Sequence, residues 1–184
     1  MLGGSRRLGR VPTPAVTRLI EFIEVEHELL VGDAAGIDAA FQQELASRRY
    51  KNVLVFTSLP SPRNNLGNWA VKTVATGLKS RSAAMHTVKD REMVRIADCG
   101  LMIWDCESPG TLANMIDFVE SGKSTLVWIP GDELLWELNS PKSLSGLLTK
   151  YPEPAAEARK RLRTYRNRLS REDSASPPTL FETA

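Results

Sequence analysis

Short runs of consecutive apolar residues alternate along the chain with longer segments in which apolar residues recur every three or four positions. Four apolar runs, at residues 29–31, 53–56, 101–104 and 125–129, are typical of strands that are buried on both faces. Parallel strands need long crossover connections, and the periodic segments lie where those crossovers would be. The pattern therefore predicts an α/β fold, a Rossmann-like doubly wound parallel sheet in a three-layer α/β/α arrangement.

Helices are expected between the apolar runs. Pro14 opens the first, with a stripe at positions 16, 19, 20 and 23, and the segment from Gly36 opens the second, with a stripe at 37, 40, 41 and 45. A third helix is expected to end near Ala97, and a fourth to run from Pro109 to Gly122. Residues 58–82 show no assignable pattern, and residues 134–151 indicate short helices that cover an edge of the sheet.

The two ends of the chain differ from this pattern. Met1 and Leu2 precede two glycines and read as the end of a strand whose first part is missing, so one central strand is expected to be short. A chain extended upstream by about five residues, the common strand length, is expected to be more stable. Residues 1–150 are expected to form one ligand-binding domain, residues 151–170 a basic helix, and residues 171–184 a disordered tail.

Composition narrows the setting. A chain of 184 residues with 42% hydrophobic residues suits one globular domain with a full core, and no apolar run approaches the ~20 residues that span a bilayer. No signal-peptide pattern is present at the start, so a cytoplasmic protein without membrane association is expected. Cys99 and Cys106 are too far apart on one strand to form a disulfide, which also favours a reducing compartment.

Charge is unevenly distributed. Residues 151–171 carry seven basic and two acidic residues, whereas the rest of the chain carries 17 basic and 20 acidic residues. Such a segment is a candidate for weak nucleic-acid contact through Arg159, Arg163 and Arg166, although a basic face is more often simply solvated.

His27 and His86 have no metal-ligand spacing with the cysteines, so neither a metal nor a cofactor is expected. The sequence does not decide between a monomer and a homo-oligomer.

Three glycine-bearing loops follow predicted strands, where ligands bind to open α/β sheets. They cover residues 3–6, 32–38 and 105–111. In the third loop, Ser108 suits the N-cap and Pro109 the first helical position, so Gly110 and Thr111 would present free backbone N–H groups to a phosphate. The alternative is an ordinary capped helix without a ligand.

Other polar groups complete the candidate site. Asp33 or Asp38 could accept hydrogen bonds from ribose hydroxyls or from a base, although Asp38 could equally be a first-turn acid that favours its own helix dipole. Residues 63–65 and 89–91 combine cations with hydrogen-bonding groups, as phosphate and sugar recognition requires, or else are solvated surface runs. The four tryptophans are expected to pack rather than to stack on bases.

From about residue 3 to residue 129 the chain resembles the SLOG superfamily, a Rossmann-like fold shared by cytokinin-activating phosphoribohydrolases and the DNA-processing protein DprA. Residues 3–6 look like the G-S-R loop of its first strand, residues 32–38 like the G-x-A-x-G-I-D signature of DprA, and residues 108–111 stand where the phosphoribohydrolases carry P-G-G-x-G-T-x-x-E. The chain looks most similar to small stand-alone bacterial members that also carry R-N-N, K-D-R-x-M and W-D-x-x-S-P-G-T, which implies nucleotide-derivative binding, for example as a sensor.

Two departures from the phosphoribohydrolase pattern bear on activity. Asn114 stands where that pattern has a catalytic glutamate, and Lys89 where it has an arginine. An amide cannot act as an acid or base, so standard base-releasing hydrolysis is not expected. An N-glycosidic hydrolase or transferase with a different acid remains the alternative, with Asp90, Asp105 and Lys89 as catalytic candidates. DprA-like single-stranded nucleic-acid binding is the second alternative.

The expected ligand is a nucleotide or a nucleotide-derived small molecule. The candidate ligand-binding residues are Gly4, Ser5, Arg6, Gly32, Asp33, Gly36, Asp38, Arg63, Asn65, Lys89, Asp105, Ser108, Gly110, Thr111 and Asn114.

Overall fold

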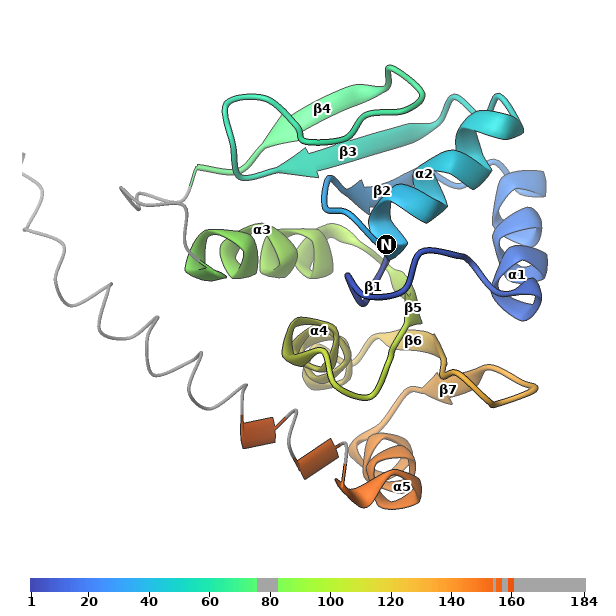
Figure 1. Ribbon diagram of the computed structural model, residues 1–184, viewed down its shortest axis with the longest axis vertical. Coiled ribbons are helices and arrows are strands. Elements are labelled where there is room, and N and C mark those ends of the chain that lie inside the picture. The colour runs from blue at the N-terminus through green and yellow to red at the C-terminus, as the bar shows by residue number, and fades with distance from the viewer. Residues whose placement is uncertain (76–82, 154, 157–158, 161–184) are drawn as a thin grey trace, which may run out of the picture.

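The computed structural model describes residues 1–75, 83–153, 155–156 and 159–160. Within them, one seven-stranded sheet has the strand order β4-β3-β2-β1-β5-β6-β7 (Figure 1). All neighbouring strands pair in parallel except β6 and β7, which are antiparallel. The order reverses at β1, with β2 on one side and β5 on the other, as in a doubly wound sheet. The predicted α/β fold class is confirmed.

The bounds of the elements follow the apolar pattern closely. The strands are β1 (Leu2–Gly4), β2 (Leu29–Gly32), β3 (Val53–Thr57), β4 (Ala70–Thr73), β5 (Cys99–Ile103), β6 (Ser124–Trp128) and β7 (Trp136–Leu138). The helices are α1 (Thr13–Glu24), α2 (Ile37–Ser47), α3 (Ala83–Ile96), α4 (Pro109–Glu120) and α5 (Pro141–Lys150). The four predicted strands and four predicted helices are all present within one or two residues.

Two apolar clusters cover the two faces of the sheet. On one face Leu19 of α1 and Phe41 of α2 pack with Val31 and Leu101. On the other face α3, α4 and α5 pack against alternate positions of the same strands, such as Met102 (Figure 1). Because successive strand side chains point to opposite faces, a continuous apolar run supplies both clusters. The result is the expected three-layer arrangement.

The strand β1 is three residues long and lies in the centre of the sheet. All three residues pair with β5, and Leu2 also pairs with Val31 of β2. Before the strand, the Met1 carbonyl accepts a hydrogen bond of 2.8 Å from the backbone N–H of Leu101. A short central strand brings the loop after it, at residues 5–10, to the middle of the sheet's carboxyl edge, where it meets the loops after β2 and β5.

Two segments, residues 134–151 and 58–82, contain edge strands that the sequence did not predict. Residues 134–151 are not only short helices, because Trp136–Leu138 forms the edge strand β7 before α5 begins. Three residues are too few to show a period-2 pattern, whereas α5 has a capping box between Ser140 and Ser143. The segment with no assignable pattern contains β4, an edge strand with mostly exposed side chains. Its register comes from pairing with β3 rather than from burial.

The basic segment is described only in part. Residues 152–153, 155–156 and 159–160 are helical, and the rest of the helix predicted over residues 151–170 lies mostly outside the described residues. Arg163, Arg166 and the predicted tail at 171–184 lie outside the described residues. Among the residues that the structure covers, no helix is both long enough and apolar enough to cross a bilayer. Cys99 and Cys106 are both free thiols, the first exposed and the second buried.

Candidate functional site

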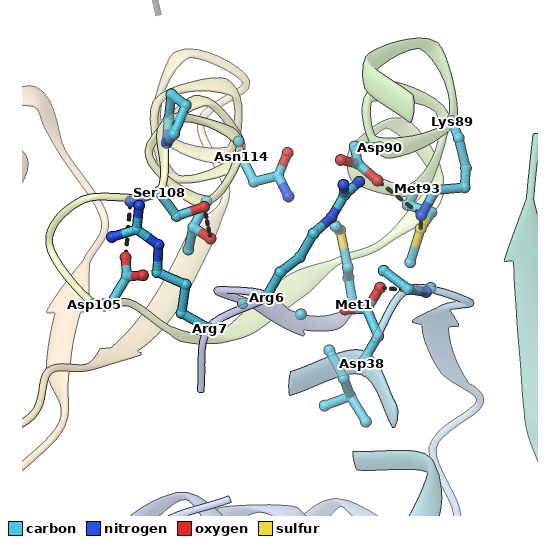
Figure 2. A pocket seen from close by; sticks show the side chains of 18 of the residues that line it. Met1, Arg6, Arg7, Asp38, Lys89, Asp90, Met93, Asp105, Ser108 and Asn114 are labelled. Carbon is cyan, nitrogen blue, oxygen red and sulfur yellow. Dashed lines mark hydrogen bonds and ion pairs between the residues drawn. The ribbon is translucent and has the colours of Figure 1, made fainter. Parts of the chain in front are cut away.

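A cavity of about 280 Å³ opens at the carboxyl edge of the sheet, where β1, β2 and β5 end. This volume is close to the lower end of the range for small-molecule pockets. Its walls come from the three glycine-bearing loops, from the first turns of α4, and from the face of α3 that carries Lys89, Asp90 and Met93 (Figure 2). The location is the one that the strand order predicts, because the strand order reverses at β1.

The amino end of α4 forms one wall of the cavity. Asp105 shapes the loop before it, since its Oδ1 accepts hydrogen bonds from the backbone N–H groups of Glu107 (3.0 Å) and Ser108 (2.7 Å). Ser108 is the N-cap residue, but its side chain does not cap the helix; its Oγ instead accepts a hydrogen bond of 3.2 Å from the Thr111 hydroxyl. The first helical backbone bond runs from Leu112 to the Ser108 carbonyl.

Gly110 is therefore open toward the cavity. A Cβ atom added there would meet nothing within 4 Å, and no side chain among the described residues caps α4. The first N–H groups of a helix have no partner inside the helix, and here Gly110 and Thr111 carry two of them. Together with the positive end of the helix dipole they make a wall suited to an anion.

Ser5 and Gly4 hold the first loop in place rather than line the cavity with polar groups. Ser5 is fully buried, and its Oγ accepts a hydrogen bond of 3.0 Å from the backbone N–H of Asp105. A Cβ on Gly4 would lie 2.3 Å from the Ile103 carbonyl oxygen, so glycine permits the close pairing of β1 with β5. The two residues join the first and third loops, which lie 100 positions apart in the sequence.

Two arginines follow Ser5 and both line the cavity. Figure 2 shows Arg7 beside the loop of Asp105 and Ser108, and it forms an ion pair with Glu107. Arg6 extends into the space between Asn114 on α4 and Asp90 on α3 (Figure 2). The structure records no hydrogen bond or ion pair for Arg6 within the described residues. Its guanidinium is available to a ligand.

Asp33 points into the protein, away from the cavity. It is fully buried and pairs with Arg63 through Nη2 at 2.7 Å and Nε at 3.2 Å, and it also accepts hydrogen bonds from the Arg63 backbone and the Thr57 hydroxyl. Burial alone would raise the pKa of this carboxyl, but the hydrogen bonds from Arg63 and Thr57 outweigh it and lower the pKa to about 2. These hydrogen bonds join the loop after β2 to the end of β3 and the loop that follows it.

The neighbouring asparagines and glycine have structural roles of the same kind. Asn64 donates a hydrogen bond of 2.9 Å to the Asp33 carbonyl, and Asn65 bonds both the backbone N–H and the carbonyl of Trp69. Gly36 has a φ of +79°, and a Cβ there would lie 2.4 Å from the backbone of Arg6. The close backbone approach at Gly36 is thus made by the first loop and not by a ligand.

A group of three charged side chains, Asp38, Lys89 and Asp90, forms the opposite wall. The Lys89 ammonium is buried and lies 2.9 Å from Oδ1 of Asp90. A Cβ on Gly32 would lie 2.2 Å from Asp38 Oδ2 and 2.8 Å from Lys89 Nζ, so the carboxylate and the ammonium both lie directly beside this glycine. Any side chain at position 32 would displace one of them.

The carboxyl of Asp38 differs electrostatically from that of Asp33. Burial raises its pKa to about 6, against the opposing attraction of Lys89, and the negative charge of Asp90 raises it further. For Lys89, burial opposes the charged form, but Asp90 and Asp38 outweigh burial and raise its pKa. Only one hydrogen bond to Asp38 is recorded within the described residues, a 3.3 Å contact from the backbone N–H of Ala34 to Oδ2. The site therefore holds a carboxyl that titrates near neutral pH.

Asn114 projects from α4 into the cavity (Figure 2). Its side chain is 8% exposed, and no hydrogen-bond partner is recorded for its amide among the described residues. Its amide is not among the fully buried polar atoms that lack a partner, because it faces the open cavity, where solvent or a ligand can bond it.

The structure brings most of the predicted site residues into one cavity and gives the others supporting positions. Lining it are Gly4, Arg6, Gly32, Asp38, Arg63, Lys89, Asp90, Asp105, Ser108, Gly110, Thr111 and Asn114. Ser5, Asp33, Gly36 and Asn65 lie outside the lining and hold its loops. Sequence reasoning missed Glu107, which lies within the third loop, and Arg7, which directly follows the first. It also missed Met1 and Met93, whose apolar character indicated only core.

In the described part of the chain, no group of three or more His, Cys, Asp or Glu side chains is placed to hold a metal ion. A scan against protein-family models and searches of curated proteins and of solved structures found no match.

Proposed function

We propose that this protein binds a nucleotide or a nucleotide-derived phosphate compound in the cavity at the carboxyl edge of its sheet. The observation that carries the proposal is the uncapped amino end of α4, which faces a cavity with an arginine that has no recorded partner. Gly110 leaves room for a ligand group, the helix supplies free N–H donors and a positive potential, and Arg6 supplies a positive charge.

The other walls suit the rest of such a ligand. Met1, Met93 and Pro109 provide apolar surface, while Asn114 and the charged group at Asp38 provide donors and acceptors. A pocket that combines an apolar surface with a few convergent polar groups is typical of small-molecule sites. Arg63 lines the cavity as well, but its guanidinium is already held by Asp33.

Isothermal titration calorimetry tests the proposal directly. The probes are AMP, GMP, CMP and UMP, with inorganic phosphate as the competitor. We expect at least one nucleotide to bind, inorganic phosphate to compete with it, and Gly110→Asp to abolish binding, because the new carboxylate occupies the anion position and repels the ligand. Binding that survives Gly110→Asp would place the ligand elsewhere, and no binding by any probe would reject the nucleotide.

One observation favours N-glycosidic hydrolysis or transfer as a second candidate function. A carboxyl that titrates near pH 6, such as Asp38, suits a general acid or base, and it lies in the cavity next to Lys89 and Asp90. Asp105 suits this role less, because its Oδ1 already accepts two backbone hydrogen bonds. Incubating the protein with each nucleotide and measuring the released base by chromatography tests this candidate. Release that is lost in Asp38→Asn would support it, and intact nucleotides after long incubation would reject it.

A further inference from the structure

The charged group Asp38–Lys89–Asp90 forms a wall of the cavity that phosphate binding does not use. Lys89 is almost completely buried, and its ammonium carries three hydrogens. The recorded partners of that ammonium are the Asp90 carboxylate and, at 3.8 Å, the Met93 sulfur. Burying these charges is costly unless they are paired and hydrogen-bonded, and the pairing visible among the described residues is incomplete.

The two carboxylates have acceptor capacity to spare. An ionised carboxylate has about four acceptor positions. Asp38 has one recorded hydrogen bond, on Oδ2, and its Oδ1 lies beside Gly3 of β1, on the floor of the cavity. Asp90 uses Oδ1 for Lys89 and lines the same cavity. Two carboxylate acceptors and the Lys89 donor thus line one cavity.

Vicinal hydroxyl groups complement this arrangement. Each hydroxyl can donate to a carboxylate oxygen and accept from an ammonium at the same time, and such charge-assisted hydrogen bonds are the stronger kind. Phosphates do not fit here, because the two carboxylates give the group a net negative charge. The unpartnered amide of Asn114, which both donates and accepts, points into the same cavity from the opposite helix.

We propose that Asp38, Lys89 and Asp90 bind the 2′,3′-diol of a ribose, so that the site selects ribonucleotides over 2′-deoxyribonucleotides. This inference rests on the proposed function, since it places the sugar of the same ligand whose phosphate lies at the amino end of α4. The diol lies against α3 and the floor of the cavity, while the phosphate lies at α4 on the other side.

The test compares matched ligands on the same protein. The affinities of AMP, GMP, CMP and UMP are measured by calorimetry beside those of their 2′-deoxy counterparts, and ribose 5-phosphate and 2-deoxyribose 5-phosphate are compared as competitors that lack a base. We expect each 2′-deoxy compound to bind at least about tenfold more weakly, because one hydrogen bond to a charged group is lost. The same ratio for the two sugar phosphates would assign the selectivity to the sugar alone.

Variants assign the selectivity to these side chains. Asp90→Asn is expected to reduce the preference for ribose at least several-fold while inorganic phosphate still competes for the site. Asp98→Asn is the matched control, because Asp98 is exposed and precedes β5, at the opposite edge of the sheet. Circular dichroism melts of both variants check folding, and the wild-type comparison decides the inference even where a variant fails to fold.

The outcomes separate the two proposals. Equal affinities for ribose and 2′-deoxyribose forms would overturn the diol inference and leave phosphate binding intact. A preference that persists in Asp90→Asn and in Asp38→Asn would overturn the assignment to this group. No binding by any phosphate-containing probe would overturn the proposed function as well.

Discussion

Asp33, in the loop after β2, and Asp38, in the first turn of α2, lie five residues apart, yet their surroundings have opposite effects on the pKa of each carboxyl. Asp33 is fully buried among donors from Arg63 and Thr57, and its pKa falls to about 2. Asp38 lies at a cavity with one recorded hydrogen bond, and its pKa rises to about 6. Burial raises the pKa of both carboxyls, so the difference comes from how many donors surround each of them.

This difference separates a carboxylate whose acceptor positions are filled by protein groups from one that still has acceptor positions free. The Asp33 carboxylate is saturated by protein groups and joins the loops after β2 and β3, so a ligand has nothing to add to it. The Asp38 carboxylate is held in its charged form at a cost, which a ligand with hydroxyl donors would reduce. Perturbed carboxyls that lack protein partners are therefore the better markers of a binding site.

The largest effect is expected from Asp33→Asn. The substitution keeps the shape of the side chain but leaves the Arg63 guanidinium and the Thr57 hydroxyl without their charged partner. Because Arg63 remains partly exposed, we expect a loss of about 2–4 kcal/mol in the free energy of unfolding, somewhat below the range for a completely buried pair. Urea denaturation followed by circular dichroism measures it. An effect as small as that of the exposed control Asp98→Asn would contradict the structural role.

Low pH should weaken the same contact between Asp33 and Arg63. The folded pKa of Asp33 lies below its ordinary value of 3.8, so its contribution is fully present above about pH 4 and is lost as the pH falls toward 2. Its full value is roughly 2 kcal/mol. Wild-type stability should thus fall more than that of Asp33→Asn between pH 5 and pH 2.5. Parallel curves for the two proteins would show that Asp33 is not the group that titrates.

Asp38→Asn should raise the free energy of unfolding, whereas Asp33→Asn should lower it. The folded pKa of Asp38 is raised from 3.8 to about 6, so the folded state binds the proton more tightly than the unfolded chain, and ionisation costs stability as the pH rises from about 4 to 6. The neutral amide avoids this cost. We expect the free energy of unfolding to increase by roughly 1–2 kcal/mol at pH 7.5 and not to change below pH 4. The value at pH 7.5 is reduced for solvent screening, because the cavity leaves Asp38 partly exposed. A loss of stability at pH 7.5 would show that Lys89 depends on this carboxylate.

The smallest effect concerns the pH dependence of ribose selectivity. Asp38 faces Lys89 and Asp90 on α3 and interacts electrostatically with Asp33 and Arg63, and burial raises its own pKa to about 6. As the pH falls from 7.5 to 5, protonation removes one charged acceptor, so the ratio of ribose to 2′-deoxyribose affinity should fall about two- to fivefold. Asp38→Asn should have a ratio independent of pH over this range. A ratio that rises in acid would contradict the role of the Asp38 carboxylate.

The sequence predicted the sheet well because buried strands and amphipathic helices leave strong periodic patterns. Residues 101–104, for example, are apolar throughout, and the first three of them belong to the central strand β5, with contacts on both faces. The edge strands β4 and β7 escaped prediction, since their residues are held by pairing with a neighbour rather than by burial. The same glycine-bearing loops that the pattern singled out meet at the cavity.

Roles within the site were harder to predict. Asp33 and Asp38 look equivalent in the sequence, and the direction in which each points depends on Arg63 and Lys89, which lie 30 and 51 residues beyond them. The motif of Arg63, Asn64 and Asn65 suggested ligand contacts, but its hydrogen bonds are made to Asp33 and Trp69. Long-range pairing of this kind leaves no local pattern.

The central claim is that a phosphate group binds at the amino end of α4, and amide NMR tests it most directly. Backbone ¹H–¹⁵N spectra are recorded while inorganic phosphate is added at constant ionic strength, with chloride as the reference ion. We predict saturable shifts of the Gly110 and Thr111 amide resonances in the wild type and in Gly146→Asp, a control that adds the same charge on α5, away from the cavity. Those shifts should be absent in Gly110→Asp, whose melting temperature should stay close to that of the wild type, because the added side chain has room and its charge suits the helix dipole. Phosphate-dependent shifts confined to other regions, or unchanged binding in Gly110→Asp, would contradict the account.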